Sequence, residues 1–247
     1  MRNFKIIFEY DGSDFCGWQT QAQGERTVQG EMEVVLLKVF KQPIKVIASG
    51  RTDSGVHARG QVVSFKAQTR MKSLEIKRAL NSLLPKDIAV NEAREVKEDF
   101  HAQYSVKEKT YRYTVFNGEH RSVFLRDRVY FFPHPLNISN MRKAAKFLVG
   151  RHDFKSFQAF DPLRAEKQTV RTIKKMTIKK EEDLVHIEIT ADGFLYKMVR
   201  NIVGTLLAIG SGRLPVNEMP KILKAKNRKA ARETAPAQGL CLMVVKY

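Results

Sequence analysis

The first half of the chain alternates between strand-like and helix-like spacing of its hydrophobic residues. Residues 4–10 (FKIIFEY) are β-branched and aromatic and are followed by the turn signal DGS, which predicts a strand. From Val28 onward apolar residues recur at helical spacing, and Thr27 is placed to cap that helix. A second helix is predicted from about Ser73 to Pro85. The other predicted strands of this half are 44–49, 61–67 and 88–96.

The second half repeats this order of elements. Its predicted strands are 109–116, 128–132, 171–180, 184–190 and 241–247. Its predicted helices are 141–148, 195–206 and a short basic helix over about 217–230. Gly150 suits the left-handed position that ends the first of these helices.

Both halves match the βαββαβ order of a ferredoxin-like unit. We therefore predict an α+β fold of two ferredoxin-like halves, 1–105 and 106–247, whose mostly antiparallel sheets have helices on one face and leave the other face free for a ligand. One connection is unusual. The two central strands of the first half are joined by Gly50–Gly60 (GRTDSGVHARG), which is long for a hairpin, and such loops are often functional.

Composition narrows the class of protein. Of 247 residues, 43% are hydrophobic and 28% are charged, which is typical of a globular protein and excludes a disordered chain. No stretch approaches the roughly 18 consecutive apolar residues of a transmembrane helix. The N-terminus reaches acidic residues before an apolar core of signal-peptide length, so we expect a cytoplasmic protein.

Charge gives the first indication of function. Lys and Arg number 44 against 26 Asp and Glu, a net charge of +18 that favours a polyanionic partner, nucleic acid first. A basic protein without such a partner stays open on charge alone, whereas a membrane-surface anchor is disfavoured because the basic residues are spread along the chain. Two cysteines far apart, Cys16 and Cys241, and scattered histidines predict neither a disulfide nor a metal site.

The Gly50–Gly60 loop concentrates residues that could react. Asp53 could form a purely structural Asx-turn beside Ser54 and Gly55. Alternatively, the positive charge of Arg51 keeps the Asp53 carboxylate ionised, so that it can act as a nucleophile or base. A hydrolase pair of Ser54 and His57 is disfavoured, because the loop lacks the G-x-S-x-G context that makes such a serine reactive.

At this loop the chain resembles a known family. GRTDSGVHA is similar to the catalytic loop of the tRNA pseudouridine synthase A family, and blocks along essentially the whole chain resemble the family in the same order. These blocks are YDGSDFCGWQ, TVQ, LNSLLPKDIAV, DFHAQYS, KTYRYTV, HDFKSF, VRTI, FLYKMVRNIVG and APAQGLCL. Any one block is weak evidence, but the set is specific.

The resemblance implies an enzyme without a cofactor that isomerises uridine to pseudouridine in RNA. The N1–C1′ bond breaks, the uracil turns and C5 joins C1′, and the uridine must first be flipped out of the RNA stack. It further implies that two sheets flank an RNA-binding cleft, that the substrate is the anticodon arm of tRNA at positions 38–40, and that the enzyme is a homodimer. Asp53 matches the catalytic aspartate.

Other site residues follow from the same resemblance. Tyr111 matches a tyrosine that stacks on the flipped uracil, and Arg200 matches a basic residue that pairs with the aspartate. Each residue also has a purely structural interpretation: Tyr111 as a half-buried tyrosine of a strand, and Arg200 as a surface arginine. We expect Arg51 to contact a phosphate or the flipped nucleotide and His57 to support the loop. Phe100 and His101 resemble an element that lies against RNA.

Two residues depart from the family pattern. Gln103 stands where the family commonly has arginine, in a segment expected to touch the flipped nucleotide or its neighbours, and Ser54 replaces an alanine. The first change leaves open an enzyme redirected to another RNA or tRNA position. A non-catalytic RNA-binding protein is the rival from another class. The basic tracts 164–180 and 221–232 suit phosphate contacts that position an RNA stem.

Overall fold

The computed structural model describes residues 1–21, 24–160 and 168–247. Arg164 and Lys167 of the basic tract lie outside these described residues. The chain divides into two compact units: Met1–Lys107 with Cys241–Tyr247, and Glu108–Leu240. This grouping places the last residues with the first unit, whereas the predicted division at residue 105 assigns them to the second half. The two-domain assignment stays a prediction.

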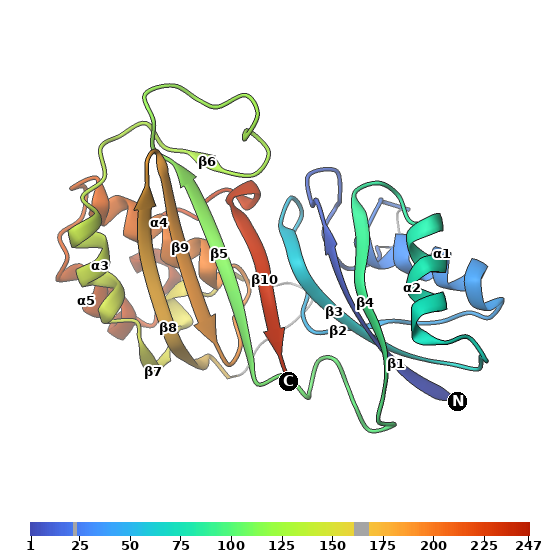
Figure 1. Cartoon of the computed structure of the whole chain (residues 1–247). Coiled ribbons are helices and arrows are strands. Elements are labelled where there is room, and N and C mark those ends of the chain that lie inside the picture. Colours follow the sequence, from blue (N-terminus) through green and yellow to red (C-terminus); the bar gives the residue numbers. More distant parts are fainter. Residues whose placement is uncertain (22–23, 161–167) are drawn as a thin grey trace. The chain divides into compact units, whose positions relative to one another are not determined.

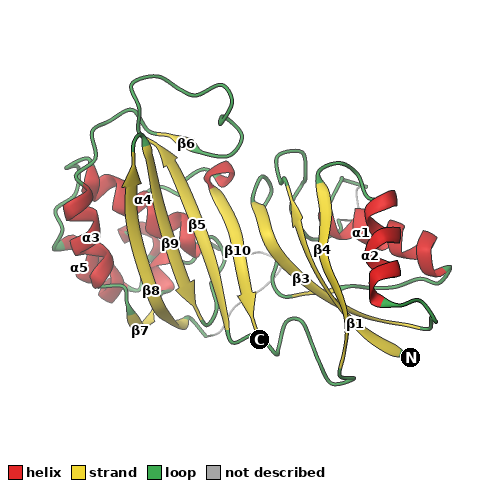
Figure 2. Ribbon diagram, viewed as in Figure 1, coloured by secondary structure: helices red, strands yellow, loops and turns green. Residues whose placement is uncertain are grey.

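The first unit has the predicted order of elements (Figures 1 and 2). They are β1 (Arg2–Tyr10), α1 (Val28–Phe40), β2 (Ile47–Ala48), β3 (His57–Ala67), α2 (Ser73–Leu83) and β4 (Ile88–Val96). The strands are ordered β4-β1-β3 with β2 on the other edge of β3, and each of these pairs is antiparallel. The C-terminal strand β10 (Leu240–Lys246) runs parallel to β3, with Cys241 opposite His57.

The core of the first unit lies between this sheet and its two helices. The Thr27 hydroxyl caps α1 by accepting the Gly30 N–H at 3.2 Å, and Glu75 accepts the Lys72 N–H at 2.6 Å at the start of α2. The helices bury their apolar stripes, and α2 packs beside β4. Fully buried side chains include Phe4, Ile6, Phe8, Val28, Met32, Leu36, Ile76 and Leu80.

Strand β2 is shorter than the predicted strand 44–49. The Val46 N–H donates to Glu33 Oε1 of α1 at 3.3 Å, and Lys45 forms an ion pair with Glu33 at 2.8 Å. These contacts tie the residues before Ile47 to the helix instead of the sheet. β3 in turn begins at His57, earlier than predicted, so the loop that contains Asp53 is confined to 49–56.

The second unit has one mostly antiparallel sheet with its helices on one face (Figure 2). Its elements are β5 (Glu108–Phe116), β6 (Tyr130–Phe131), α3 (Ile138–Lys146), β7 (Gly150–Asp153), the 3-10 turn η1 (Lys155–Phe157), β8 (Val170–Glu181), β9 (Leu184–Ala191), α4 (Met198–Gly210), α5 (Glu218–Ala225) and the 3-10 turns η2 (Arg228–Ala230) and η3 (Ala237–Gly239). The strand order is β5-β9-β8-β7, with β6 parallel to β5. The mixed α+β class predicted from the sequence is confirmed.

Several helix ends differ from the predictions. The basic helix predicted over about 217–230 is divided into α5, which ends at Ala225, and the turn η2, and α4 continues to Gly210, beyond the predicted Leu206. The helix α3 ends at Lys146, and Gly150 uses its positive φ of 110° as the first residue of β7 rather than as the end of the helix. The helix α4 begins at Met198 because Lys197 is left-handed, with φ 56°, and Leu195 lies in the preceding turn. No helix in the described ranges is long and apolar enough to cross a membrane.

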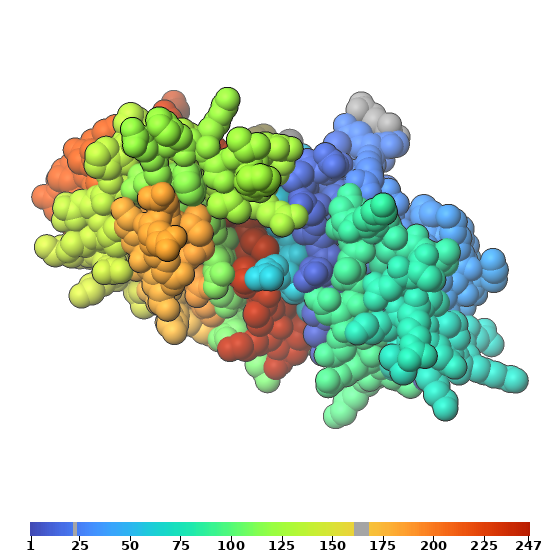
Figure 3. All heavy atoms as spheres, turned by 45° about the horizontal axis from the view of Figure 1, so that its top comes forward, coloured from blue at the N-terminus to red at the C-terminus, as the bar shows by residue number. Residues whose placement is uncertain are grey.

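The two faces of the second sheet differ in polarity. Toward the helices, alternate residues of β5 and β9 such as Tyr113, Val115 and Ile187 are fully buried. On the opposite face, polar side chains pair across β5 and β9: Thr110 with Thr190, Arg112 with Glu188, and Thr114 with His186. The connection between β5 and β6 projects from this unit (Figure 3) and exposes 97% of Phe124.

Candidate active site

Asp53 lies in the 49–56 loop of the first unit, on a tight turn. The Val56 N–H donates to the Asp53 carbonyl at 3.2 Å, and Gly55 has a positive φ of 75°. Asp53 is partly exposed, whereas Thr52 and Val56 on either side of the turn are buried. Asp53 therefore lies, partly exposed, on a backbone turn that is itself anchored.

The anchor is the loop that follows β1. The Trp18 N–H donates to the Thr52 carbonyl at 3.0 Å. The Phe15 carbonyl accepts both the Ser54 hydroxyl at 3.1 Å and the Gly55 N–H at 3.4 Å. These hydrogen bonds hold the residues directly before and after Asp53.

Gly17 is required for this contact. Its φ is +89°, which side chains rarely adopt, and a Cβ built on it would lie 2.9 Å from the Thr52 carbonyl oxygen. The glycine therefore permits both the turn of its own loop and the close approach to the Asp53 turn.

A buried pair of hydroxyl groups adds a side-chain contact. The Tyr10 hydroxyl and Thr52 Oγ1 are 2.7 Å apart, and both residues are buried. Burial raises the pKa of Tyr10 to about 12, so the phenol is neutral at physiological pH. Tyr10 is therefore a structural partner of the turn.

His57 supports the same loop, as the sequence led us to expect. Its imidazole is buried, and Nδ1 lies 3.0 Å from the Gly12 nitrogen and 3.2 Å from Asp11 Oδ1. A Cβ on Gly12 would lie 2.1 Å from the Val56 carbonyl oxygen, so the two loops are in direct backbone contact there. Ser54 is committed to Phe15, and the geometry gives no support to a hydrolase pair.

Arg26 stabilises the loop between β1 and α1. Its guanidinium makes two hydrogen bonds to Asp87, at 2.7 and 2.9 Å, and lies 4.2 Å from the centre of the Phe15 ring. No sequence pattern indicates this role of Arg26 or the roles of Tyr10 and Thr52. Each depends on contacts between residues far apart in the chain.

The remaining predicted residues of the first unit lie in two places. Arg51 is exposed in the same loop as Asp53, next to Gly50, whose carbonyl accepts the Gln61 side-chain amide at 3.0 Å. Phe100, His101 and Gln103 follow β4. The Phe100 ring packs on Tyr247 at 4.9 Å, and His101 Nδ1 accepts the backbone N–H of Gln103 at 3.2 Å.

The segment around Gln103 is separated from the Asp53 turn along β3. Ala102 donates its N–H to Ser64 Oγ, whereas Thr52 bonds Tyr10, which pairs with Ala58. The stretch of β3 from Ala58 to Ser64 spans about 20 Å at roughly 3.3 Å per residue. Within this unit, Gln103 is therefore not beside Asp53.

Tyr111 and Arg200 belong to the second unit. The Tyr111 side chain is buried, and its ring packs edge-on against Phe194 at 5.1 Å. Two residues along β5, on the same side of the strand, the Tyr113 hydroxyl donates to the Pro236 carbonyl at 2.8 Å. Burial raises the pKa of Tyr113, while the nearby Arg200 charge acts in the opposite direction.

Arg200 is half-buried in the first turn of α4. Its Nε donates to the Ala235 carbonyl at 2.7 Å, and the Ala235 N–H donates to the Arg200 carbonyl at 3.1 Å. The segment 235–236 thus contacts both Arg200 and Tyr113. The guanidinium is held by a backbone, which is unlike the freely moving arginine of a solvated surface.

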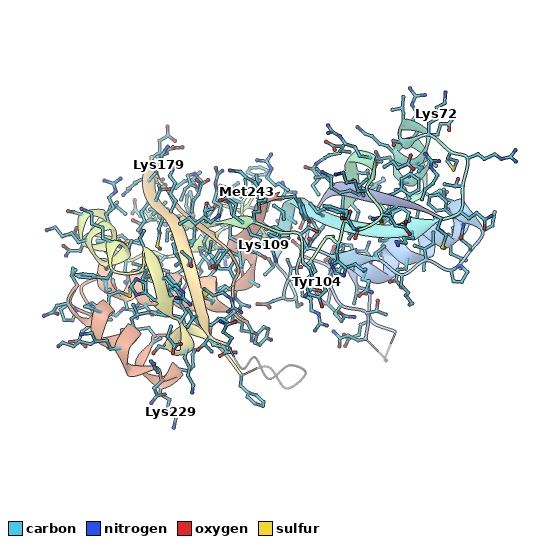
Figure 4. All side chains as sticks on the ribbon, turned by 90° about the horizontal axis from the view of Figure 1, so that it is seen from below. Lys72, Tyr104, Lys109, Lys179, Lys229 and Met243 are labelled. Carbon is cyan, nitrogen blue, oxygen red and sulfur yellow. The ribbon has the colours of Figure 1, made fainter. Side chains whose placement is uncertain are left out.

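Basic side chains on the second unit are spread over its surface. Lys179 at the end of β8 and Lys229 in η2 project from opposite sides of this unit (Figure 4). Exposed lysines can contact phosphates without reading a base sequence.

Comparisons with known proteins agree with the sequence blocks. A family model described as tRNA pseudouridine synthase matches residues 6–105 and 144–247. The chain is 44% identical over 247 residues to the tRNA pseudouridine synthase A of Thermoanaerobacter sp. (strain X514), covering 100% of both chains. It is 46% identical over 252 residues to the protein of the same name from Limosilactobacillus reuteri (strain DSM 20016), covering 100% of this chain and 97% of that one.

Proposed function

Since the chain belongs to the tRNA pseudouridine synthase family and is an isomerase that converts uridine to pseudouridine in tRNA, we propose that Asp53 is its catalytic carboxylate. The family predicted from the sequence is confirmed, and an enzyme is favoured over a non-catalytic RNA-binding protein. One observation supports Asp53 above all. Asp53 is a partly exposed residue on a turn whose flanking residues are hydrogen-bonded to Tyr10, Phe15 and Trp18.

The reaction explains why such a carboxylate is useful. The N1–C1′ bond of a flipped uridine breaks, the uracil turns, C5 bonds to C1′, and the proton on C5 is lost while N1 gains one. A carboxylate serves this sequence either as a nucleophile or as the base that removes a proton. A pre-anchored turn places the carboxylate without reorganisation of the backbone during the reaction.

Tyr111 and Arg200 are proposed to act in the same reaction. The resemblance assigns Tyr111 to stacking on the flipped uracil and Arg200 to pairing with the catalytic aspartate. In support, the Tyr111 ring is fixed by Phe194 and the Arg200 guanidinium is fixed by Ala235. Fixed orientations are what stacking and bidentate ion pairing require.

The other predicted residues are proposed to bind RNA around this centre. Arg51 is exposed and next to the Asp53 turn, which suits a phosphate of the flipped nucleotide. Phe100, His101 and Gln103 are proposed to contact RNA further along the substrate. The exposed Tyr104 ring stacked on His101 at 4.2 Å gives that segment an aromatic surface.

The target is proposed to be positions 38–40 in the anticodon arm, and the active form a homodimer. Gln103 keeps the alternative of another tRNA position open. Sedimentation at micromolar concentration tests the assembly: we expect twice the monomer mass, and a monomer that is fully active would contradict the dimer.

A mapping experiment tests the target and Asp53 together. The chain and its Asp53→Asn variant are expressed in a bacterial strain lacking its own tRNA pseudouridine synthase A, and pseudouridines are located by carbodiimide labelling and primer extension. We expect modification at 38–40 with the wild-type chain and none with the variant. Modification only at other positions would favour a redirected enzyme, and modification by the variant would contradict the role of Asp53.

A further inference from the structure

The first turns of α4 are in close contact with the segment 232–235. Arg200 and Ala235 exchange two hydrogen bonds, at 2.7 and 3.1 Å. One turn further, a Cβ on Gly204 would lie 1.8 Å from the Glu233 carbonyl oxygen, so no side chain fits between helix and segment. Whatever fixes this segment therefore also fixes the partner of the Arg200 side chain.

Three polar side chains meet directly beside the Arg200–Ala235 pair. The Thr234 hydroxyl donates to Asn201 Oδ1 at 2.6 Å, and Arg228 Nη2 lies 3.0 Å from both of those oxygens. Asn201 adjoins Arg200 in the helix, and Thr234 adjoins Ala235 in the segment. The cluster of Asn201, Arg228 and Thr234 therefore connects the residue after Arg200 with the residue before Ala235.

The cluster is anchored to the rest of the second unit. Asn201 is fully buried and its Nδ2 donates to the Phe157 carbonyl at 2.7 Å. Ser156, next in the chain, donates to the Ile222 carbonyl at 2.6 Å and accepts the Asn227 N–H at 3.0 Å. The residue before Arg228 is therefore tied to the same turn as Asn201, which leaves the cluster little freedom to move.

Arg228 differs from the other basic residues of the 221–232 tract. Within the described residues its side-chain hydrogen bonds go to the uncharged oxygens of Asn201, Thr234 and Ala231. Partial burial lowers the pKa of its guanidinium. Burying a cation against neutral partners costs stability. Because its donors point inward to these oxygens, Arg228 does not have the geometry of a surface residue that only contacts phosphate.

We propose that Arg228 is a positioning residue for the isomerisation, acting through Asn201 and Thr234 to hold Arg200 in its working orientation. The proposal rests on the proposed role of Arg200. Its physical basis is geometric: a displacement of about 1 Å in a group that orients the reaction is enough to cost roughly 100-fold in rate. Removing the Arg228 donors frees Thr234 and Ala235 to shift, and the Arg200 guanidinium shifts with them.

The test compares chemistry with binding and stability. Arg228→Met removes all its donors and keeps the stem, and Thr234→Val removes one hydroxyl at constant volume. We expect the single-turnover rate of pseudouridine formation at saturating tRNA, per folded molecule, to fall about 10- to 100-fold for Arg228→Met and less for Thr234→Val, with tRNA Kd within about 3-fold. If Arg228→Met does not fold, Thr234→Val gives the answer.

Arg142→Met is the matched control. Arg142 ties α3 to β8 through a 2.8 Å hydrogen bond to the Ile178 carbonyl and is remote in sequence from the cluster. We expect it to lower the Tm while the rate per folded molecule stays at the wild-type value. Wild-type rates in both Arg228→Met and Thr234→Val would overturn the positioning role.

A double-mutant cycle separates this proposal from the one on which it rests. If Arg228 acts through Arg200, Arg228→Met slows an Arg200→Lys enzyme less than 3-fold, because the group it positions is already altered. An undiminished effect in that background would contradict the proposal. A wild-type rate for Arg200→Lys alone would instead overturn the role of Arg200 and, with it, the positioning role.

Discussion

At the scale of single residues, Asp53 depends on hydrogen bonds made by its two neighbours. Thr52 bonds Tyr10 and Trp18, and Ser54 bonds Phe15. A neutral hydrogen bond contributes about 1 kcal/mol net, so moving the turn out of these three bonds costs about 3 kcal/mol. That is a factor of roughly 100 in population, which keeps the carboxylate in one place.

The Tyr10 hydroxyl gives a pH-dependent test of this anchor. Tyr10→Phe should cost about 1 kcal/mol at pH 8, because the buried Thr52 hydroxyl loses its partner. The folded pKa of Tyr10 is raised from 10.0 to about 12, so the wild-type stability that depends on the neutral phenol is present below pH 10 and is lost as pH rises toward 12. At pH 11 that loss is about 1.4 kcal/mol.

Urea unfolding of both proteins from pH 8 to 11 measures the difference. The wild type should be the more stable protein at pH 8, and the two should become about equal near pH 11. A stability difference that does not change with pH would show that Tyr10 is not held neutral by burial.

At the scale of elements, the loop between β1 and α1 serves as the support for the loop between β2 and β3. Its shape depends on Gly17, which combines a φ of +89° with a 2.9 Å approach to the Thr52 carbonyl. Gly17→Ala should destabilise the chain by about 1–2 kcal/mol from the left-handed backbone alone. It should also slow pseudouridine formation by about 10-fold or more, because the Asp53 turn is pushed aside.

Gly24→Ala provides the matched control. Gly24 also has a positive φ, of +74°, but among the residues that the structure describes a Cβ there would meet nothing within 4 Å. We expect both variants to lower the Tm, Gly17→Ala by more because of the clash with Thr52, and only Gly17→Ala to lose rate per folded molecule. Equal rates in the two variants would contradict the supporting role of the loop.

The order of elements could be predicted from the sequence, but the contacts between loops could not. Hydrophobic spacing indicated α1 and β1 because those patterns are local. The length of β2 depends on a hydrogen bond from Val46 to Glu33, and the start of α4 on the left-handed Lys197. Such features depend on side chains that come together only in the folded chain, so the hydrophobic periodicity of the sequence does not predict them.

The candidate site shows the same division. A specific motif predicts Asp53 as a site residue, and the same loop predicts a supporting role for His57. Tyr10, Thr52 and Arg26 were missed as its partners, since the Tyr10–Thr52 pair joins residues 42 positions apart. Arg228 looked like one more basic residue of a charged tract. Only its inward hydrogen bonds to Asn201 and Thr234 distinguish it.

At the scale of the whole molecule, the net charge of +18 should dominate binding to tRNA. Lys and Arg that neutralise phosphates release condensed counterions, so six to ten such contacts should weaken binding roughly 10³- to 10⁵-fold between 50 and 200 mM salt. Filter binding or fluorescence anisotropy with unmodified tRNA over that range measures the effect. A Kd that changes less than 3-fold would contradict the charge argument.

The catalytic role of Asp53 is tested most directly by single-turnover pseudouridine formation with the Asp53→Asn variant, at a saturating excess of enzyme over tRNA. Asparagine keeps the size of the side chain and its capacity for turn hydrogen bonds but removes the charge. Asp14→Asn, an exposed aspartate of the same unit, changes net charge equally and serves as the control. We predict that Asp53→Asn keeps the wild-type Tm within a few degrees and tRNA Kd within about 3-fold, while its rate falls at least about 10³-fold. A folded, tRNA-binding Asp53→Asn protein that forms pseudouridine at the rate of the Asp14→Asn control would contradict the account.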